Sequence, residues 1–228
     1  MAILIALPMV TAQEEITSDL AGITPDSPFY AIDVFWDNVI TSFYKGEAKV
    51  NLEIRVANER IAEMLKLREE VDELEKFRGI PETSVATERN IELKIRAISK
   101  ARIEYSRFVV KIKEDSLKTV DAEVFKKVED SIRKHIVILR ELKSNLPVEA
   151  QESFQTAIDS SSKVVSRVDK LLCSSDNGCS GLLCPTISSG STRPTCKVNI
   201  CKCDLTGVDD LSVLPQEIVT SIQGLRTR

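Results

Sequence analysis

The sequence has little glycine, few aromatic residues and a single histidine, and cysteine is missing from its first 172 residues. Eight glycines among 228 residues and an aromatic content of 5% argue against a sandwich or barrel of short strands. Both values suit long helices better. The only histidine, His135, has no second histidine with which to build a metal or catalytic site. On a helix it is more typical of a packed side chain bonded to a neighbour than of a base or ligand.

Common catalytic motifs are absent as well. The chain has no Gly-x-Ser-x-Gly elbow, no phosphate-binding loop, no Gly-x-Gly-x-x-Gly and no His-Glu-x-x-His. We therefore expect a protein that is not an enzyme and uses no cofactor. The net charge of −4 gives no overall attraction to nucleic acid. No apolar run reaches the roughly 20 residues that span a bilayer, so we expect no stable transmembrane anchor.

The N-terminus is an apolar stretch of about ten residues that resembles the end of an export signal. Val10 and Ala12 are small residues at the −3 and −1 positions of a signal-peptidase site, which predicts residues 1–12 as a signal cleaved before Gln13. The basic segment that should precede the apolar run is missing, which suggests that the true start lies upstream. The alternative is a buried N-terminal strand or helical turn.

Apolar residues recur every three or four positions through most of the next 150 residues, which indicates amphipathic helices. A first helix is expected to follow Ser27 and Pro28, a capping residue and a favoured first helical residue, and to end near Tyr44. Its apolar face contains Phe29, Ile32, Trp36, Val39, Ile40 and Phe43. Further helices are expected at about 47–77, from 83 or 84, around 125–146 and after Pro147. Because such stripes must pack on one another, we predict an all-α fold with an elongated antiparallel bundle of about five helices over 13–172.

The last quarter of the chain contains all six cysteines, Cys173, Cys179, Cys184, Cys196, Cys201 and Cys203. An exported protein with this pattern favours three disulfides. Six cysteines permit fifteen pairings, and those that join Cys201 to Cys203 are disfavoured by ring strain. Zinc is the alternative, but there is no Cys-x-x-Cys and no nearby histidine. We expect a small disulfide-stapled, loop-rich module at 173–204, because the segment has no aromatic residue for a core. A tail at 205–228 follows, with a weakly amphipathic stretch from Leu214 to Leu225.

Three segments carry a resemblance to a known family. They are Gly22 to Tyr30 (Gly-Ile-Thr-Pro-Asp-Ser-Pro-Phe-Tyr), Leu52 to Glu63, and His135 to Ser161. Over about 20–172 the chain resembles an uncharacterised family of exported archaeal and bacterial helical proteins, a domain of unknown function. The resemblance implies an exported helical bundle and no established activity. The cysteine segment separately resembles small secreted cysteine-rich modules, which serve many roles.

The leading functional hypothesis is an exported, non-enzymatic cell-envelope or secreted protein. In it the bundle is a spacer or docking surface, the cysteine module is a recognition tip, and the partner is a protein at or outside the cell surface. The alternative is an exported helical chaperone or metal-stress protein. A hydrolase with a carboxylate pair is less favoured, because the acidic residues mostly fall opposite the apolar stripes. The heptad-like spacing around His135 suits pairing within the chain or across a homo-oligomer equally well.

Overall fold

The computed structural model describes residues 15–80, 84–119, 121–173, 175–179 and 191–206. In chain order its elements are η1 (Ser18–Leu20), α1 (Tyr30–Phe43), α2 (Gly46–Glu75), α3 (Ser84–Thr119), α4 (Ala122–Ser144), α5 (Val148–Asp169), η2 (Asp176–Cys179), β1 (Ser191–Lys197) and β2 (Ile200–Thr206). The predicted all-α bundle of about five helices with a small disulfide-stapled module is confirmed. The two-stranded sheet within that module was not foreseen.

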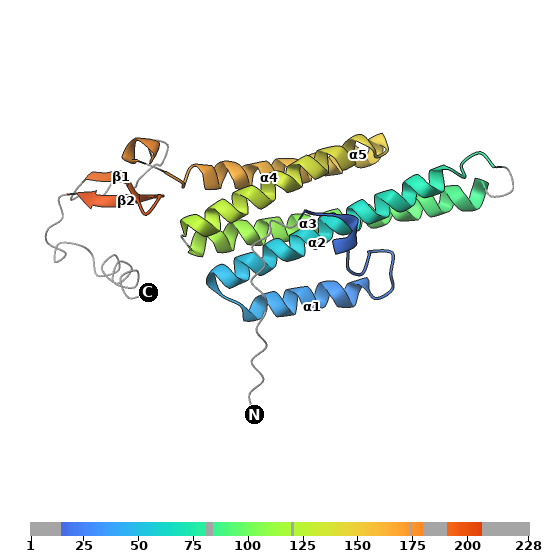
Figure 1. Cartoon of the computed structure of the whole chain (residues 1–228), viewed down its shortest axis with the longest axis horizontal. Coiled ribbons are helices and arrows are strands. Elements are labelled where there is room, and N and C mark those ends of the chain that lie inside the picture. Colours follow the sequence, from blue (N-terminus) through green and yellow to red (C-terminus); the bar gives the residue numbers. More distant parts are fainter. Residues whose placement is uncertain (1–14, 81–83, 120, 174, 180–190, 207–228) are drawn as a thin grey trace, which may run out of the picture.

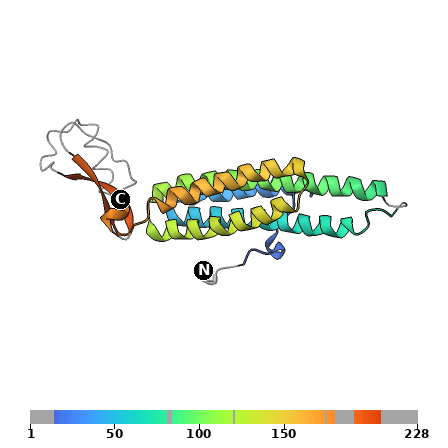
Figure 2. The ribbon, with the colours of Figure 1, turned by 90° about the horizontal axis from the view of Figure 1, so that it is seen from above.

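Helices α2 to α5 form an elongated bundle of two long hairpins packed side by side (Figure 1). Helix α2 packs against α3, α4 packs against α5, and the two pairs meet through α2 with α4 and α3 with α5. Seen from above, α2 and α3 project beyond α4 and α5 at one end, and the sheet lies at the opposite end (Figure 2). None of the described helices is long and apolar enough to cross a membrane.

The core lies along the axis of this bundle. Its largest fully buried side chains come from all four helices and include Leu67, Tyr105, Phe108, Phe125, Leu139 and Phe154. These are the positions that the spacing of threes and fours predicts, because residues at that spacing lie on one side of a helix. Asp121 starts α4 by accepting hydrogen bonds from the backbone N–H groups of Glu123 and Val124, at 2.8 and 3.2 Å.

The C-terminal sheet is an antiparallel hairpin of β1 and β2. Val198 and Asn199 form its turn, and both have positive φ, 53° and 59°. A two-residue turn with positive φ at both positions matches the right-handed twist of the strands it joins. The hairpin is attached to the end of α5, because the Cys201 N–H donates to the Leu171 carbonyl at 2.8 Å and Ile200 is buried in the bundle core.

Candidate functional site

Helix α1 is packed with its apolar face outward. Tyr30 and Thr41 are its only buried residues, and it contacts the bundle mainly through α2. The large apolar side chains along it are 43–79% exposed: Phe29, Ile32, Phe35, Trp36, Ile40, Phe43 and the adjoining Tyr44. We call this set the α1 apolar face. The sequence-based expectation that this stripe packs into the bundle is therefore wrong, and α1 forms the outermost layer on one side of it (Figure 1).

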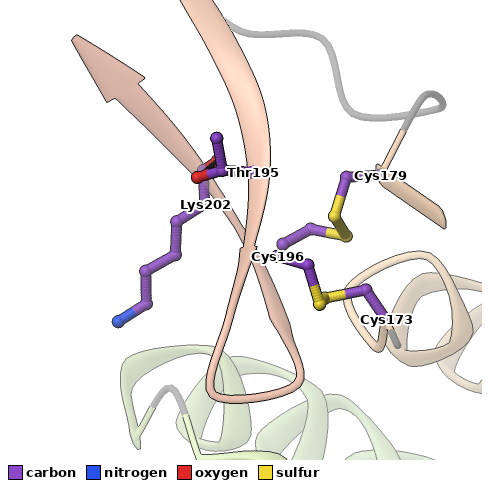
Figure 3. The surroundings of a disulfide bond; sticks show 6 residues. Cys173, Cys179, Thr195, Cys196 and Lys202 are labelled. Atoms are coloured by element: carbon purple, nitrogen blue, oxygen red, sulfur yellow. Dashed lines mark hydrogen bonds between the residues drawn. A yellow bond between two sulfur atoms is a disulfide. The ribbon is translucent and has the colours of Figure 1, made fainter. Parts of the chain in front are cut away.

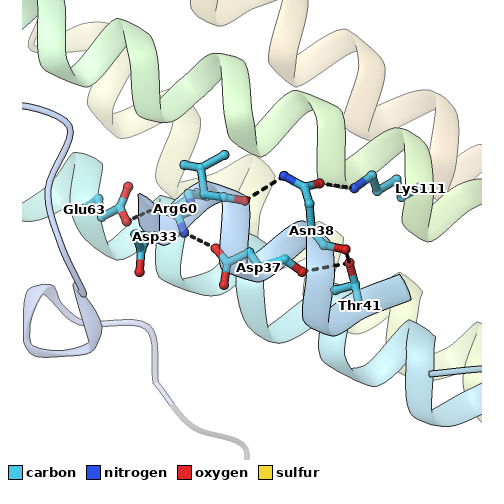
Figure 4. A network of polar contacts seen from close by, with 8 residues as sticks. Asp33, Asp37, Asn38, Thr41, Arg60, Glu63 and Lys111 are labelled. Carbon is cyan, nitrogen blue, oxygen red and sulfur yellow. Dashed lines mark hydrogen bonds and ion pairs between the residues drawn. The ribbon is translucent and has the colours of Figure 1, made fainter. Parts of the chain in front are cut away.

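The polar side of α1 points inward because a buried arginine on α2 requires it to. The Arg60 side chain is 0% exposed, and its guanidinium donates to Asp33 at 2.8 Å and also to Asp37 and Glu63 (Figure 4). The guanidinium carbon Cζ of Arg60 also lies 5.2 Å from the centre of the Tyr30 ring, within range of a cation–π contact. Had α1 turned its apolar face to α2, Arg60 would have been buried without Asp33 and Asp37.

One further polar contact joins the second half of α1 to the bundle. Lys111 of α3 donates to the Asn38 side-chain oxygen at 2.5 Å (Figure 4). The buried Thr41 hydroxyl is satisfied within α1 itself, because it donates to the Asp37 carbonyl at 2.8 Å. The contacts of Arg60 and Lys111 together set the rotation of α1 about its own axis. The outcome is an uncharged aromatic surface held on a rigid support, with its charges turned toward the protein.

The charges around Arg60 are unusual for a protein interior. Burial raises the pKa of Glu63 to about 8 against the opposing effect of Arg60, and its Oε2 atom has no hydrogen-bond partner. Burial also raises the pKa of Asp37 and of Glu59. Burial alone would lower the pKa of Arg60, but the neighbouring carboxylates, Glu63 first, raise it above its usual range. The positive charge of the Arg60 guanidinium thus stabilises the surrounding cluster of carboxyl groups.

Oxygens of Asp33, Glu59 and Glu63 lie within 4.8 Å of one another, close enough to hold a metal ion. The donors are all carboxylates, which suit a hard cation such as calcium rather than a transition metal. However, Asp33 and Glu63 are already bonded to Arg60, which lies among them as an internal cation. This arrangement is explained by the attachment of α1 without any bound ion.

A second buried acid, Glu53, lies about two turns before Arg60 on α2. It is 0% exposed, and neither carboxyl oxygen has a hydrogen-bond partner. Burial raises its pKa to about 8, and the nearby Asp115 adds to the rise. Asp115 itself is held by Lys49 and Lys118 at 2.9 and 2.8 Å, and these partners lower its pKa to about 2 against the effect of burial.

Sequence reasoning did not single out Arg60, Glu53 or Glu63, and it expected the acidic residues to fall mostly opposite the apolar stripes. Their spacing contains a signal, because Glu53, Val56, Arg60 and Glu63 follow each other by three, four and three and so share a face of α2. The expectation that acidic residues avoid the buried faces is wrong for both glutamates. Neither carboxyl is open to a substrate, since both residues are 0% exposed.

His135 is a packed residue, as expected. It is 0% exposed, its Nε2 lies 2.7 Å from the Asn58 side-chain oxygen, and its ring meets Tyr105 edge to face at 5.4 Å. Burial lowers the pKa of His135 to about 3, with Lys134 adding to the effect, so the ring is neutral at any physiological pH.

Four of the six cysteines form two disulfides, Cys173–Cys196 and Cys179–Cys201. The first joins the segment that follows α5 to β1, and the second joins η2 to β2 (Figure 3). Their sulfurs are therefore not thiolates, which removes these four from any zinc site. Cys184 and the side chain of Cys203 lie outside the part of the chain that the structure describes, as do the predicted signal at 1–12 and most of the tail at 205–228.

A comparison with known protein families finds one matching family over residues 22–149, a domain of unknown function (DUF5667). The match begins at the Gly22 to Tyr30 segment, includes α1 and ends at the start of α5. No curated protein and no solved structure matches the chain.

Proposed function

The chain belongs to this family of unknown function, and we propose that it is an exported, non-enzymatic docking protein of the cell envelope or extracellular space. The observation that carries the proposal is the α1 apolar face, which exposes seven large apolar side chains along one short helix. Soluble monomers rarely expose a continuous apolar patch of more than a few hundred Å², and larger patches mark interaction sites.

The support of this surface is consistent with binding. Arg60, Asp33 and Asp37 hold α1 in one rotation, so its side chains are presented without a folding step that would weaken binding. Aromatic residues are also the side chains most enriched in the centres of protein interfaces. The partner of such a face is a protein with an exposed apolar surface.

The disulfides support an extracytoplasmic location. Cys173–Cys196 and Cys179–Cys201 hold a hairpin that reaches the bundle core through Ile200, and such bonds persist in oxidising compartments. The bundle then separates two surfaces: the α1 apolar face on its side and the stapled hairpin at its end. We propose the hairpin as a second recognition surface.

Site-specific photo-cross-linking in the source cell tests the docking role. A benzophenone amino acid replaces Phe35 on the α1 apolar face, and the matched control replaces Phe77, which is 52% exposed beyond the end of α2. We expect a discrete protein adduct from position 35 and none, or much less, from position 77. Equal labelling at the two positions, or none at either, would disprove docking through α1.

Export is tested in the same cells by the intact mass of the protein and its digestion by protease added outside. The expected results are an N-terminus at Gln13 and loss of the protein from intact cells. A chain that keeps residues 1–12 and resists protease would place it inside the cell and contradict the proposed location.

The second candidate is the chaperone function, because an uncharged aromatic surface also binds unfolded chains. It predicts that the protein suppresses aggregation of a reduced, unfolded client and that Trp36→Asp abolishes this effect while Phe77→Asp does not. The hypothesis of a metal-stress protein has little support among the described residues. There the one histidine is buried beside the Asn58 side-chain oxygen, and four cysteines form disulfides. A hydrolase is less favoured still, since Glu53 and Glu63 are inaccessible.

A further inference from the structure

Five of the seven residues of the α1 apolar face form a stripe that reads the same in both directions along the helix. From Phe29 the stripe continues with Ile32, Trp36, Ile40 and Phe43, at spacings of three, four, four and three. Trp36 is the midpoint, with an isoleucine four residues away and a phenylalanine seven residues away on each side. All five side chains are at least 43% exposed. Such a stripe can pair like with like when its partner is a second copy of itself.

A two-fold axis brings a surface against itself, so that residue i of one copy meets residue j of the other and j meets i. If two α1 helices cross antiparallel over Trp36, each Phe29 lies against the other copy's Phe43 and each Ile32 against Ile40. Every position in the stripe then meets a residue of the same or similar kind. Resting on the proposed docking function, we infer that the partner of the α1 apolar face is a second copy of this chain, bound antiparallel with Trp36 on the two-fold axis.

The area of the face fits such a dimer. An aromatic side chain offers about 150–250 Å², so seven large side chains exposed by roughly half provide several hundred Å² per protomer. A standard stable interface buries about 800 Å² on each partner, so this face would supply a large share of the area that a dimer needs. Helix α1 is also the outermost layer on its side of the bundle, and its apolar side chains are exposed among the described residues (Figure 1).

The charges favour a protein over a lipid surface. Helices that lie on membranes carry lysine and arginine along their polar side, whereas α1 has neither in its fourteen residues. Its two acidic residues, Asp33 and Asp37, are turned inward onto Arg60. Two copies therefore meet through uncharged surfaces without repulsion, while a net charge of −4 gives no attraction to an anionic bilayer.

The sole tryptophan makes the first measurement direct, because Trp36 reports on this face alone. In the purified, oxidised full chain we expect its emission to shift to shorter wavelength as concentration rises, in step with dimerisation by analytical ultracentrifugation. Trp36→Asp places two carboxylates on the axis and should weaken the dimer at least about 30-fold, the effect of losing an interface hot spot. The matched variant Phe77→Asp should leave the dimer unchanged, and circular dichroism confirms that both variants fold.

The register is tested with cysteine variants and a short bismaleimide, with the wild-type chain as background. Trp36→Cys should cross-link to its own copy, because position 36 lies on the axis. Phe43→Cys alone should not, since its two copies would lie about 21 Å apart along the helices. A mixture of Phe29→Cys and Phe43→Cys chains should cross-link. Efficient cross-linking of Phe43→Cys alone would overturn the antiparallel register.

A wild-type chain that stays monomeric at about 100 μM would overturn the second copy as the partner. If Trp36 is shielded from quenchers in that monomer, the tail at 205–228 is the occupant, and if the monomer floats with zwitterionic vesicles, a lipid surface is. The proposed docking function and the proposed dimer can be disproved separately. A monomer that still gives a specific adduct from position 35 in cells refutes only the dimer, whereas loss of that adduct refutes docking itself.

Discussion

Helices α1 and α4 both carry apolar stripes of helical period, but α4 buries its stripe and α1 exposes it. Phe125, Ile132 and Leu139 of α4 are at most 1% exposed, whereas Phe29, Ile32 and other members of the α1 stripe are largely exposed. The difference arises from what each helix meets. Helix α4 meets apolar faces of α2 and α5, while α1 meets the side of α2 that carries Arg60. A buried charge thus decides the rotation of α1 more strongly than its own hydrophobic face does.

The largest expected contrast comes from shortening a phenylalanine on each helix. Phe125→Ala should lower the free energy of unfolding by about 3–5 kcal/mol, because it removes a buried ring and leaves a cavity. Phe43→Ala, at a position 79% exposed, should change it by less than about 0.5 kcal/mol. Urea unfolding at the lowest practical concentration measures both without a contribution from dimerisation. Similar losses would show that α1 is packed inward after all.

Removing the anchor of α1 should have the next largest effect. Arg60→Met removes the guanidinium that is bonded to Asp33, Asp37 and Glu63, and we expect a loss of about 3 kcal/mol because these carboxyl groups lose their buried partner. Hydrogen exchange should show α1 losing protection before α2 to α5 do. The control is Arg55→Met, on the exposed side of α2, which should change stability by less than about 0.5 kcal/mol. If α1 keeps its protection in Arg60→Met, the ion network does not hold it.

A smaller effect is expected from the buried acid Glu53. Its pKa is about 8 in the folded state, whereas the ordinary value for a glutamate is 4.5, so the folded state binds the extra proton between these values. Stability therefore falls as pH rises from about 4.5 to 8, and the loss is complete above the folded pKa. Glu53→Gln resembles the protonated acid and should be close to wild type at pH 5 but more stable by about 1–3 kcal/mol at pH 8.

The measurement is the melting temperature of both chains across this pH range. Each kcal/mol corresponds to about 2–4 °C for a chain of this size. Asp115 works in the opposite direction, because its pKa of about 2 makes its contribution disappear only as pH falls below 3.8. A constant difference between the two chains from pH 5 to 8 would show that Glu53 does not titrate in this window.

The comparison of α1 and α4 also explains what the sequence could predict. The spacing of threes and fours placed α2 at about 47–77 against the observed Gly46–Glu75 and started α3 within a residue of Ser84. Periodicity shows that a helix has an apolar face, but not what covers it. For the bundle helices the inward direction of the apolar face could be predicted, because these helices cover one another. For α1 the outward direction could not be predicted from its own sequence.

Arg60 shows why the candidate site was harder to predict than the fold. Its neighbours Arg55 and Glu59 have the spacing of an ordinary solvated pair, and the spacing of Arg60 from Val56 shows a shared face of α2 without showing what covers that face. The burial of Arg60 depends on Asp33 and Asp37, more than twenty residues away, which one sequence cannot bring together. The hairpin was missed for a related reason, since its strands are stabilised by disulfides and by Ile200 docking rather than by an alternating pattern of their own.

The smallest expected effect on helical structure comes from reducing the disulfides, and it separates the hairpin from the bundle. Helices α2 to α5 are held by an apolar core, whereas the hairpin depends on two cross-links that typically contribute about 2–4 kcal/mol each. Mild reduction should therefore leave the helical circular dichroism nearly unchanged while the amides of β1 and β2 lose protection. The α1 dimer should persist, because Trp36 lies on a helix that the hairpin does not contact strongly. A large loss of helicity on reduction would mean that Ile200 and the cross-links hold the end of the bundle closed, and that the stability of the bundle depends on an oxidising environment.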